Sequence, residues 1–166
     1  MAEQEVQISI QKIYLKDFSF ESPNAPEVFT KPDWEPKTNL NIRSTHSILS
    51  DNNHEVVLTL TVETKHEDKT LFLVELHQAG IFSITGYEGD DLAAILGSFC
   101  PNVLFPYCRE SIGSVVGKGG FPEFLLQPIN FDALFAQSRQ AIADKEAEGA
   151  QEGDDSTPAA GNGSGQ

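Results

Sequence analysis

Cysteine is scarce in this sequence, and that scarcity excludes a fold built on disulfide bonds. Among 166 residues there are two cysteines, Cys100 and Cys108, which flank a proline-punctuated segment. A chain of this length buries enough surface to fold without covalent cross-links. Because cytosolic chains rarely keep disulfides, we expect two buried, reduced thiols in a cytoplasmic protein. A disulfide or a metal-binding pair is the alternative.

Positive charge is scarce as well. The chain has 11 Lys and Arg residues against 25 Asp and Glu residues, which gives a formal net charge of -14. Such a surface repels the phosphates of DNA and RNA and disfavours anionic membranes. We therefore expect no nucleic acid among the partners. Basic segments of other proteins are the partners that this charge attracts, mainly through faster encounter.

Long apolar runs and targeting signals are missing. No run of apolar residues approaches the roughly 20 residues that a membrane-spanning helix needs. The first residues, Met1–Gln7, are polar and acidic, and they lack the basic and apolar parts of a signal peptide. We expect a protein that does not insert directly into membranes.

Catalytic motifs are sparse. Gly113–Lys118 resembles a phosphate-binding loop, but it is one residue short, and Gly119 replaces the Ser or Thr that such a loop requires. The histidines and cysteines lack the paired spacing of metal ligands. Ser111 and Ser114 have no identifiable base. We predict that the protein is not an enzyme and uses neither a cofactor nor a metal ion.

Alternating apolar residues predict four β-strands in the first half of the chain. The predicted strands are Val6–Glu21, Thr38–Leu49, Glu55–Lys65 and Thr70–Gln78. The apolar positions of the first strand change parity twice, so that strand must bend, bulge or be covered on both faces. Short polar turns join the last three strands, which predicts an antiparallel meander.

The apolar spacing then changes to that of helices. Asp90 or Asp91 is predicted to cap a first helix, which Pro101 stops or kinks. A second helix is predicted to follow, with Pro106 near its first turn and a glycine-rich stretch at its end. Strands first and helices after them define an α+β fold. One face and one edge of the sheet would stay partly uncovered, which favours oligomerisation.

The end of the chain divides into a helix and a tail. Asn130 is predicted to cap a last helix that runs from Phe131 to about Glu146. From Glu148 onward the residues are mostly Gly, Ser, Ala and acidic, a composition that cannot bury a core. We therefore predict one folded domain over residues 1–147 and a disordered acidic tail over residues 148–166.

Aromatic and apolar residues gather in two loops, where a minimal core does not need them. The loop 22–37 carries four prolines, and the loop 121–128 lies between Gly and Pro residues. Either these side chains tuck into the core, or they line a groove that binds apolar extended segments. The predicted groove residues are Phe29, Trp34, Phe121, Phe124 and Leu125.

A set of short stretches carries a resemblance to a known family. The chain resembles the SecB protein-export chaperones of Gram-negative bacteria over about residues 8 to 136. The stretches occur in family order, and together they are highly specific. They are Ile13–Glu21, Pro23–Pro26, Glu55–Leu58, Gln78–Phe82, Cys100–Asn102, Leu104–Tyr107, Arg109–Glu110, Gly119–Pro122 and Pro128–Leu134.

The resemblance implies an ATP-independent chaperone without a cofactor. Such proteins bind unfolded preproteins in the cytosol, keep them competent for translocation and deliver them to SecA, the translocase ATPase. The resemblance also implies a homotetramer, a dimer of dimers whose first long helices lie between two sheets. The residues that match the SecA-contact surface are Asp17, Glu21, Leu73 and Glu75.

A second set of matching residues lies on the same strand. Val74, Leu76 and Gln78 match positions at the oligomer interface that influence tetramer assembly, and alternation places them opposite Leu73 and Glu75. Two other functions remain open: a chaperone of this fold that guards a toxin–antitoxin pair, and a protein that binds small molecules.

Overall fold

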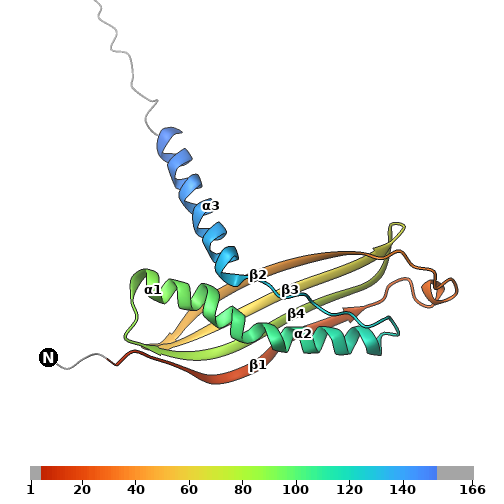
Figure 1. The fold of residues 1–166 in the computed structure, drawn as a ribbon, viewed down its shortest axis with the longest axis horizontal. Coiled ribbons are helices and arrows are strands. Elements are labelled where there is room, and N and C mark those ends of the chain that lie inside the picture. The colour runs from red at the N-terminus through yellow and green to blue at the C-terminus, as the bar shows by residue number, and fades with distance from the viewer. Residues whose placement is uncertain (1–4, 153–166) are drawn as a thin grey trace, which may run out of the picture.

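One antiparallel sheet forms the body of the protein, and helices cover one of its faces (Figure 1). The structure, a computed structural model, describes residues 5–152. The strands stand in the order β1-β4-β3-β2, so the predicted meander of the last three strands is confirmed. Their bounds are β1 Gln7–Glu21, β2 Lys37–Ser50, β3 Asn53–His66 and β4 Lys69–Thr85.

The two parity changes of β1 are two β-bulges. The pairing of β1 with β4 shifts between Ile10 and Lys12 and again between Leu15 and Asp17. Each shift inserts one unpaired residue, which turns the following apolar side chains back to the same face of the sheet. The apolar positions Ile8, Ile13, Phe18 and Phe20 therefore all pack against the core.

Strand β4 is longer than the sequence predicted. The predicted end at Gln78 is wrong, because the strand continues to Thr85. Ala79 and Gly80 interrupt the alternation of large apolar residues, so the pattern hides the continuation. A Cβ atom on Gly80 would lie 2.8 Å from the Phe82 ring and 3.1 Å from Leu104. Glycine is required here because α2 packs closely on the strand.

The predicted pair of helices is one continuous helical run. α1 (Gly89–Ala94) leads through a π-helical turn (Ile95–Phe99) into α2 (Cys100–Lys118), so Pro101 does not separate two helices. Helical residues precede Pro101, so its missing N–H interrupts the α-helical hydrogen bonds, and the π-helical turn that ends at Phe99 stands at this interruption. Pro106 lies inside the helix, not near its start.

Of the two predicted helix caps, the first is wrong and the second is confirmed. Glu88 is the N-cap of α1 and makes no side-chain capping bond, so the expected cap at Asp90 or Asp91 is wrong. Both aspartates lie in the first turn instead, where the helix dipole favours negative charge. The cap at Asn130 is confirmed, because its Oδ1 accepts a hydrogen bond from the Ala133 N–H at 3.0 Å.

The last helix extends further than predicted. α3 runs from Phe131 to Glu152, so residues 148–152 are helical and not part of a disordered tail. Ala and Glu are good helix formers, and they outweigh the single Gly149. Residues 153–166 of the predicted tail lie outside the described part of the chain. In Figure 1, α3 points away from the sheet, while its first turn lies beside the helical layer.

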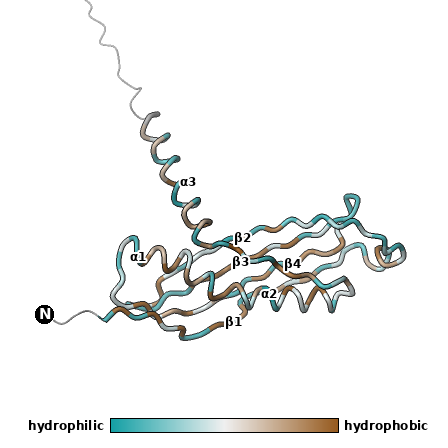
Figure 2. The backbone as a smooth tube through the Cα atoms, in the orientation of Figure 1, coloured by the Kyte–Doolittle hydropathy of each residue, from teal (hydrophilic) through white to brown (hydrophobic). Residues whose placement is uncertain are grey.

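The core lies between the sheet and the helical run. Leu58, Leu60, Leu76 and Phe82 of the central strands are fully buried, and so is Leu104 of α2. Figure 2 shows the hydrophobic colour concentrated on β3, β4 and α2, whereas β2 and the turn between β3 and β4 are mostly hydrophilic. This layer fixes the positions of the three surfaces described below.

The helical run also passes a membrane-span criterion that the sequence analysis did not anticipate. By length and composition alone, the run Gly89–Lys118 contains an 18-residue stretch that is apolar enough to cross a membrane, with a mean hydropathy of 1.2. The core helix of a soluble protein has the same composition. One side of this run is buried against the sheet by Leu104, Cys108, Ile112 and Val116.

Candidate protein-binding surfaces

Three segments far apart in the sequence meet in an aromatic cluster at one end of the sheet. Phe29 and Trp34 come from the loop after β1, Phe72 from β4, and Phe121 and Phe124 from the loop after α2. The Phe121 ring is the centre, with ring centroids 5.1 Å from Phe29, 5.5 Å from Trp34 and 5.1 Å from Phe72. We call these five residues the aromatic cluster.

A small hollow lies against this cluster. Its volume is about 110 Å³, and it is bounded by the two loops and by the ends of β2, β3 and β4. The lining includes Trp34, Pro36, Leu71, Phe72, Phe121 and Phe124. Such an apolar recess accepts a side chain of an extended segment without demanding a particular sequence.

The predicted groove residues differ in their exposure. Phe121 is buried beneath the others, whereas Phe29 is 39% exposed and Trp34 and Phe124 are half-buried. One ring therefore tucks into the core and the others form surface, and the groove that binds apolar segments stays a prediction. Leu125 is 60% exposed on the same loop as Phe124. It takes no part in the lining of this hollow.

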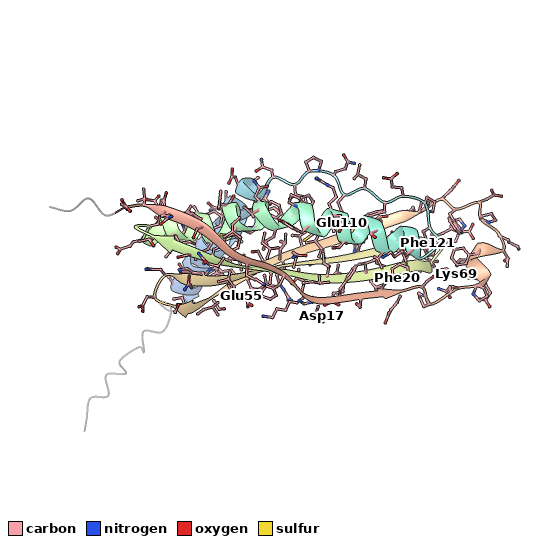
Figure 3. All side chains as sticks on the ribbon, turned by 90° about the horizontal axis from the view of Figure 1, so that it is seen from below. Asp17, Phe20, Glu55, Lys69, Glu110 and Phe121 are labelled. Atoms are coloured by element: carbon pink, nitrogen blue, oxygen red, sulfur yellow. The ribbon has the colours of Figure 1, made fainter. Side chains whose placement is uncertain are left out.

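The opposite face of the sheet carries the predicted acidic set. Glu21 pairs with Leu73, and Asp17 pairs with His77, so the four residues Asp17, Glu21, Leu73 and Glu75 share one face of β1 and β4. The three carboxylates are exposed and Leu73 is half-buried. In Figure 3, Asp17 lies on the side of the sheet away from α2. We call this set the acidic face.

A histidine holds one carboxylate of the acidic face. His77 Nε2 lies 2.8 Å from the Glu75 carboxylate, and its other ring nitrogen lies 3.3 Å from the Thr59 hydroxyl. Strand alternation places Glu75 and His77 on one face, but it does not predict their contact. Only the extended strand brings residues i and i+2 side by side.

Val74, Leu76 and Gln78 face the other way, as alternation predicts. Val74 and Leu76 are fully buried and Gln78 is nearly so, all beneath the helical layer of the single chain. The Gln78 side-chain amide donates a hydrogen bond of 3.0 Å to the Tyr14 carbonyl, next to the second bulge of β1. Because these side chains lie in the core, they reach no surface directly. Their role in assembly stays a prediction and would act through packing.

The sequence did not predict a hydrogen-bond network that lies on the same side of the sheet as the acidic face. The Tyr14 hydroxyl donates to the Glu55 carboxylate, and Lys16 Nζ donates to the same carboxylate at 2.8 Å. These two bonds lower the pKa of Glu55. Burial and the bond to Glu55 raise the pKa of Tyr14 to about 12. Since β4 separates β1 from β3, only the strand register reveals the contact.

The cysteines lie where the sequence analysis expected them. Cys100 and Cys108 are free and fully buried on the core side of α2. Burial raises the pKa of each thiol to about 12. Within residues 5–152, no three His, Cys, Asp or Glu side chains lie close enough together to hold a metal ion.

A third surface is apolar and runs along the outer side of the helical run. Phe99 is 45% exposed and Tyr107 is 48% exposed, and Val103 lies half-buried between them. Their spacing of four residues places them on one helical stripe. On the edge strand β1, Ile10 and Leu15 are each 49% exposed although they face the helical side of the sheet.

The sheet has an apolar recess on one side and a carboxylate surface on the other, an arrangement that suits the binding of polypeptides. The family model "Preprotein translocase subunit SecB" matches residues 1–142 of the chain. The chain belongs to the SecB family of protein-export chaperones.

Two relatives illustrate the match. The chain is 53% identical over 138 residues to the protein-export protein SecB of Nitrosococcus oceani, covering 82% of this chain and 84% of that protein. It is 50% identical over 132 residues to the protein-export protein SecB of Marinobacter nauticus, covering 80% and 79% of the two chains.

A solved structure supports the fold. A SecB-like chaperone of Mycobacterium tuberculosis, in complex with a ChAD peptide from the HigA1 antitoxin, matches with a TM-score of 0.61. The match covers 74% of this chain and 90% of that chain, at 17% sequence identity. It shows that the two proteins share a fold.

Proposed function

We propose that this protein is an ATP-independent cytoplasmic chaperone without enzymatic activity, which holds unfolded preproteins and delivers them to the SecA translocase ATPase. The observation that carries the client-binding part is the aromatic cluster with its hollow. Phe29, Trp34 and Phe124 present aromatic surface there, and Phe121 supports them from below. Rigid aromatic surface suits clients that share unfolded apolar stretches but no sequence.

The energetics suit a chaperone that must release what it binds. Each aromatic anchor buries about 150–250 Å². At about 25 cal/mol per Å², that area yields several kcal/mol per anchor, before the cost of ordering an unfolded chain is subtracted. Binding the unfolded state lowers the fraction of client that is free to fold, by mass action. Several grooves in one assembly would add avidity for a long client.

Calorimetry with a permanently unfolded client tests this binding site. We expect Phe29→Ala and Trp34→Ala each to weaken binding of a reduced, carboxymethylated protein by about 1–3 kcal/mol. Ile142→Ala is the matched control, because it removes an apolar side chain that is 56% exposed but lies on α3. Equal affinities for all three variants and the unchanged protein would make the groove assignment wrong.

For SecA we propose the acidic face as the contact surface. Asp17, Glu21 and Glu75 are exposed carboxylates around the half-buried Leu73, which suits a basic partner segment with an apolar residue. Charge reversal by Asp17→Lys or Glu75→Lys should weaken SecA binding and leave client affinity unchanged. Asp51→Lys, at the exposed turn between β2 and β3, makes the same charge change elsewhere. SecA affinity that is equal in all of them would refute the assignment.

We propose in addition that the protein is a homotetramer, a dimer of dimers. The apolar stripe of Phe99, Val103 and Tyr107 supports this proposal, since a soluble protein gains by covering such a surface. Static light scattering gives the mass directly. A tetramer that loses subunits in a Phe99→Lys/Tyr107→Lys double variant is the expected result. A monomeric unchanged protein would contradict the proposal.

A further inference from the structure

Hydrogen bonds join the loop after β1 to the hairpin that β3 and β4 form. We call residues 22–36 the crossover loop, because they cross from β1 to the far edge strand β2. At its start, the Ser22 hydroxyl donates to the Leu71 carbonyl at 2.9 Å, and the Asn24 amide donates to the Thr70 carbonyl at 3.0 Å. Both acceptors belong to the hairpin that β3 and β4 form. The start of the loop is therefore held by two side chains of the loop itself.

The end of the crossover loop is held by a different kind of bond. The backbone N–H of Glu35 donates to His66 Nδ1 at 3.0 Å. Here the side chain belongs to the hairpin and the loop contributes only its backbone. His66 is the last residue of β3, and its side chain is 24% exposed.

The strand ladder cannot supply this bond. β2 and β3 pair from Lys37 and Lys65 onward, so the ladder would have to continue through Pro36. Proline has no backbone N–H to donate. On the other side, Glu67 and Asp68 turn the chain away with positive φ angles of 49° and 67°. The N–H of Glu35 is left without a backbone acceptor, and an imidazole nitrogen takes that place.

The bond also fixes the state of the histidine. A backbone N–H can only donate, so Nδ1 must accept and the ring proton must lie on Nε2. Nε2 points toward the Glu67 carboxylate, 4.0 Å away. A substitute for His66 can bind the Glu35 N–H only if it has a hydrogen-bond acceptor at the position of Nδ1.

Trp34, the residue next to Glu35, transmits the consequence to the aromatic cluster. Its ring lies 5.5 Å from Phe121 and 6.1 Å from Phe29, and its Nε1 donates to the Val28 carbonyl at 3.0 Å. We infer that His66 is a positioning residue for the client groove, because it holds the end of the crossover loop and thereby the wall that Trp34 forms. The inference rests on the proposed client-binding function for its effect on affinity, but not for its effect on the loop.

Trp34 is the single tryptophan of the chain, so its fluorescence reports on this loop. The experiment uses the full-length protein in its native assembly. It measures hydrogen exchange of the Glu35 amide, acrylamide quenching of Trp34 and affinity for the carboxymethylated client. His66→Leu removes the acceptor. His66→Asn keeps one, because its Oδ1 stands where Nδ1 was. Glu35→Ala keeps the backbone N–H and removes only the carboxylate.

We expect His66→Leu to speed exchange at Glu35 by about two- to tenfold, the range of one hydrogen bond. Quenching of Trp34 should increase, and client affinity should fall by a similar factor. His66→Asn should restore all three values, and Glu35→Ala should match the unchanged protein. Unchanged exchange and quenching in His66→Leu would overturn the inference, as would a failure of His66→Asn to restore them.

The same measurements separate this inference from the proposed function. If neither the unchanged protein nor any variant binds the unfolded client, the proposed function fails. Exchange and quenching still decide whether His66 holds the loop. If the loop readouts change while a measurable client affinity stays constant, His66 does not position the groove, and the inference is overturned.

Discussion

The two faces of the sheet are made from the same strands, yet they differ in burial and polarity. On β3, the residues that face the helices, Leu58, Leu60 and Val62, are fully buried. Their neighbours on the other face include Thr61 and Glu63, which are half-buried and polar. Strand alternation separates these sets one residue at a time. Stability and the partner-facing chemistry can therefore vary independently within one sheet.

In the proposed function, the helical face recognises its partner by shape and the outer face by charge. Phe121 and its aromatic neighbours form a recess because loops close over one end of the core. Asp17 and Glu75 stand on an open surface, where long-range attraction steers a basic partner. Substitutions on the first face should change folding or client binding, and those on the second should change partner encounter. The following experiments compare the two faces directly.

Thiol labelling should show the largest contrast. Cys100 and Cys108 are buried with pKa values raised to about 12, so about one thiol in ten thousand is ionised at about pH 8. A Ser19→Cys variant places a thiol on the exposed outer face. We expect the new thiol to react with Ellman's reagent at least about a thousandfold faster than the native two, which must wait for opening of the fold.

The control for labelling is denaturant. In concentrated urea all three thiols should react at comparable rates, because burial then no longer protects any of them. Rapid labelling of Cys100 and Cys108 in the native protein would show that the helical face opens far more easily than its burial indicates.

A pair of neighbouring truncations should show the next largest effect. Leu76→Ala empties a fully buried site, so we expect it to lower the free energy of unfolding by about 2–5 kcal/mol. Glu75→Ala changes the adjacent exposed residue and should stay within about 0.5 kcal/mol. Urea denaturation at one fixed protein concentration measures both. Similar losses in the two variants would remove the distinction between the faces.

Much of this division could be predicted from the sequence, because alternation is a local property. It predicted the opposite faces of Leu73 and Val74. The parity changes of β1 predicted a bend, a bulge or coverage on both faces, and the structure has two bulges. The helix pattern was less informative. Pro101 and Pro106 each suggest a boundary, but the helix continues past both, and the π-helical turn stands at the interruption that Pro101 causes.

Contacts between strands could not be predicted in the same way. Tyr14 reaches Glu55 across β4, and His66 reaches Glu35 from the end of β3. Both contacts depend on the register of the strands, and one residue of slippage would abolish them. The aromatic cluster was predicted only in part, because the predicted list contained Leu125 and lacked Phe72. Its centre at Phe121 and the exposed position of Leu125 needed the folded chain.

Glycine substitutions test how tightly the helical face is packed. Gly80→Ala would place a Cβ atom 2.8 Å from Phe82, so we expect a loss of about 1–3 kcal/mol in the free energy of unfolding. Gly117→Ala is the control, because no atom lies within 4 Å of its Cβ position. It should stabilise the end of α2 by up to about 1 kcal/mol. A neutral Gly80→Ala would mean that the Phe82 ring and the Leu104 side chain can shift without cost.

The smallest expected effect belongs to the outer face, at the network of Tyr14, Lys16 and Glu55. Tyr14→Phe removes one hydrogen bond to the Glu55 carboxylate and should cost about 0.5–1.5 kcal/mol near neutral pH. Lys16 and Tyr14 lower the pKa of folded Glu55, so this stabilisation is present above the carboxyl's ordinary pKa and is lost as pH falls through the lowered value. The difference between Tyr14→Phe and the unchanged protein should therefore shrink in acid, as measured by urea denaturation at a series of pH values. A difference that is constant with pH would mean that Tyr14 acts through packing over β4 and not through the Glu55 charge.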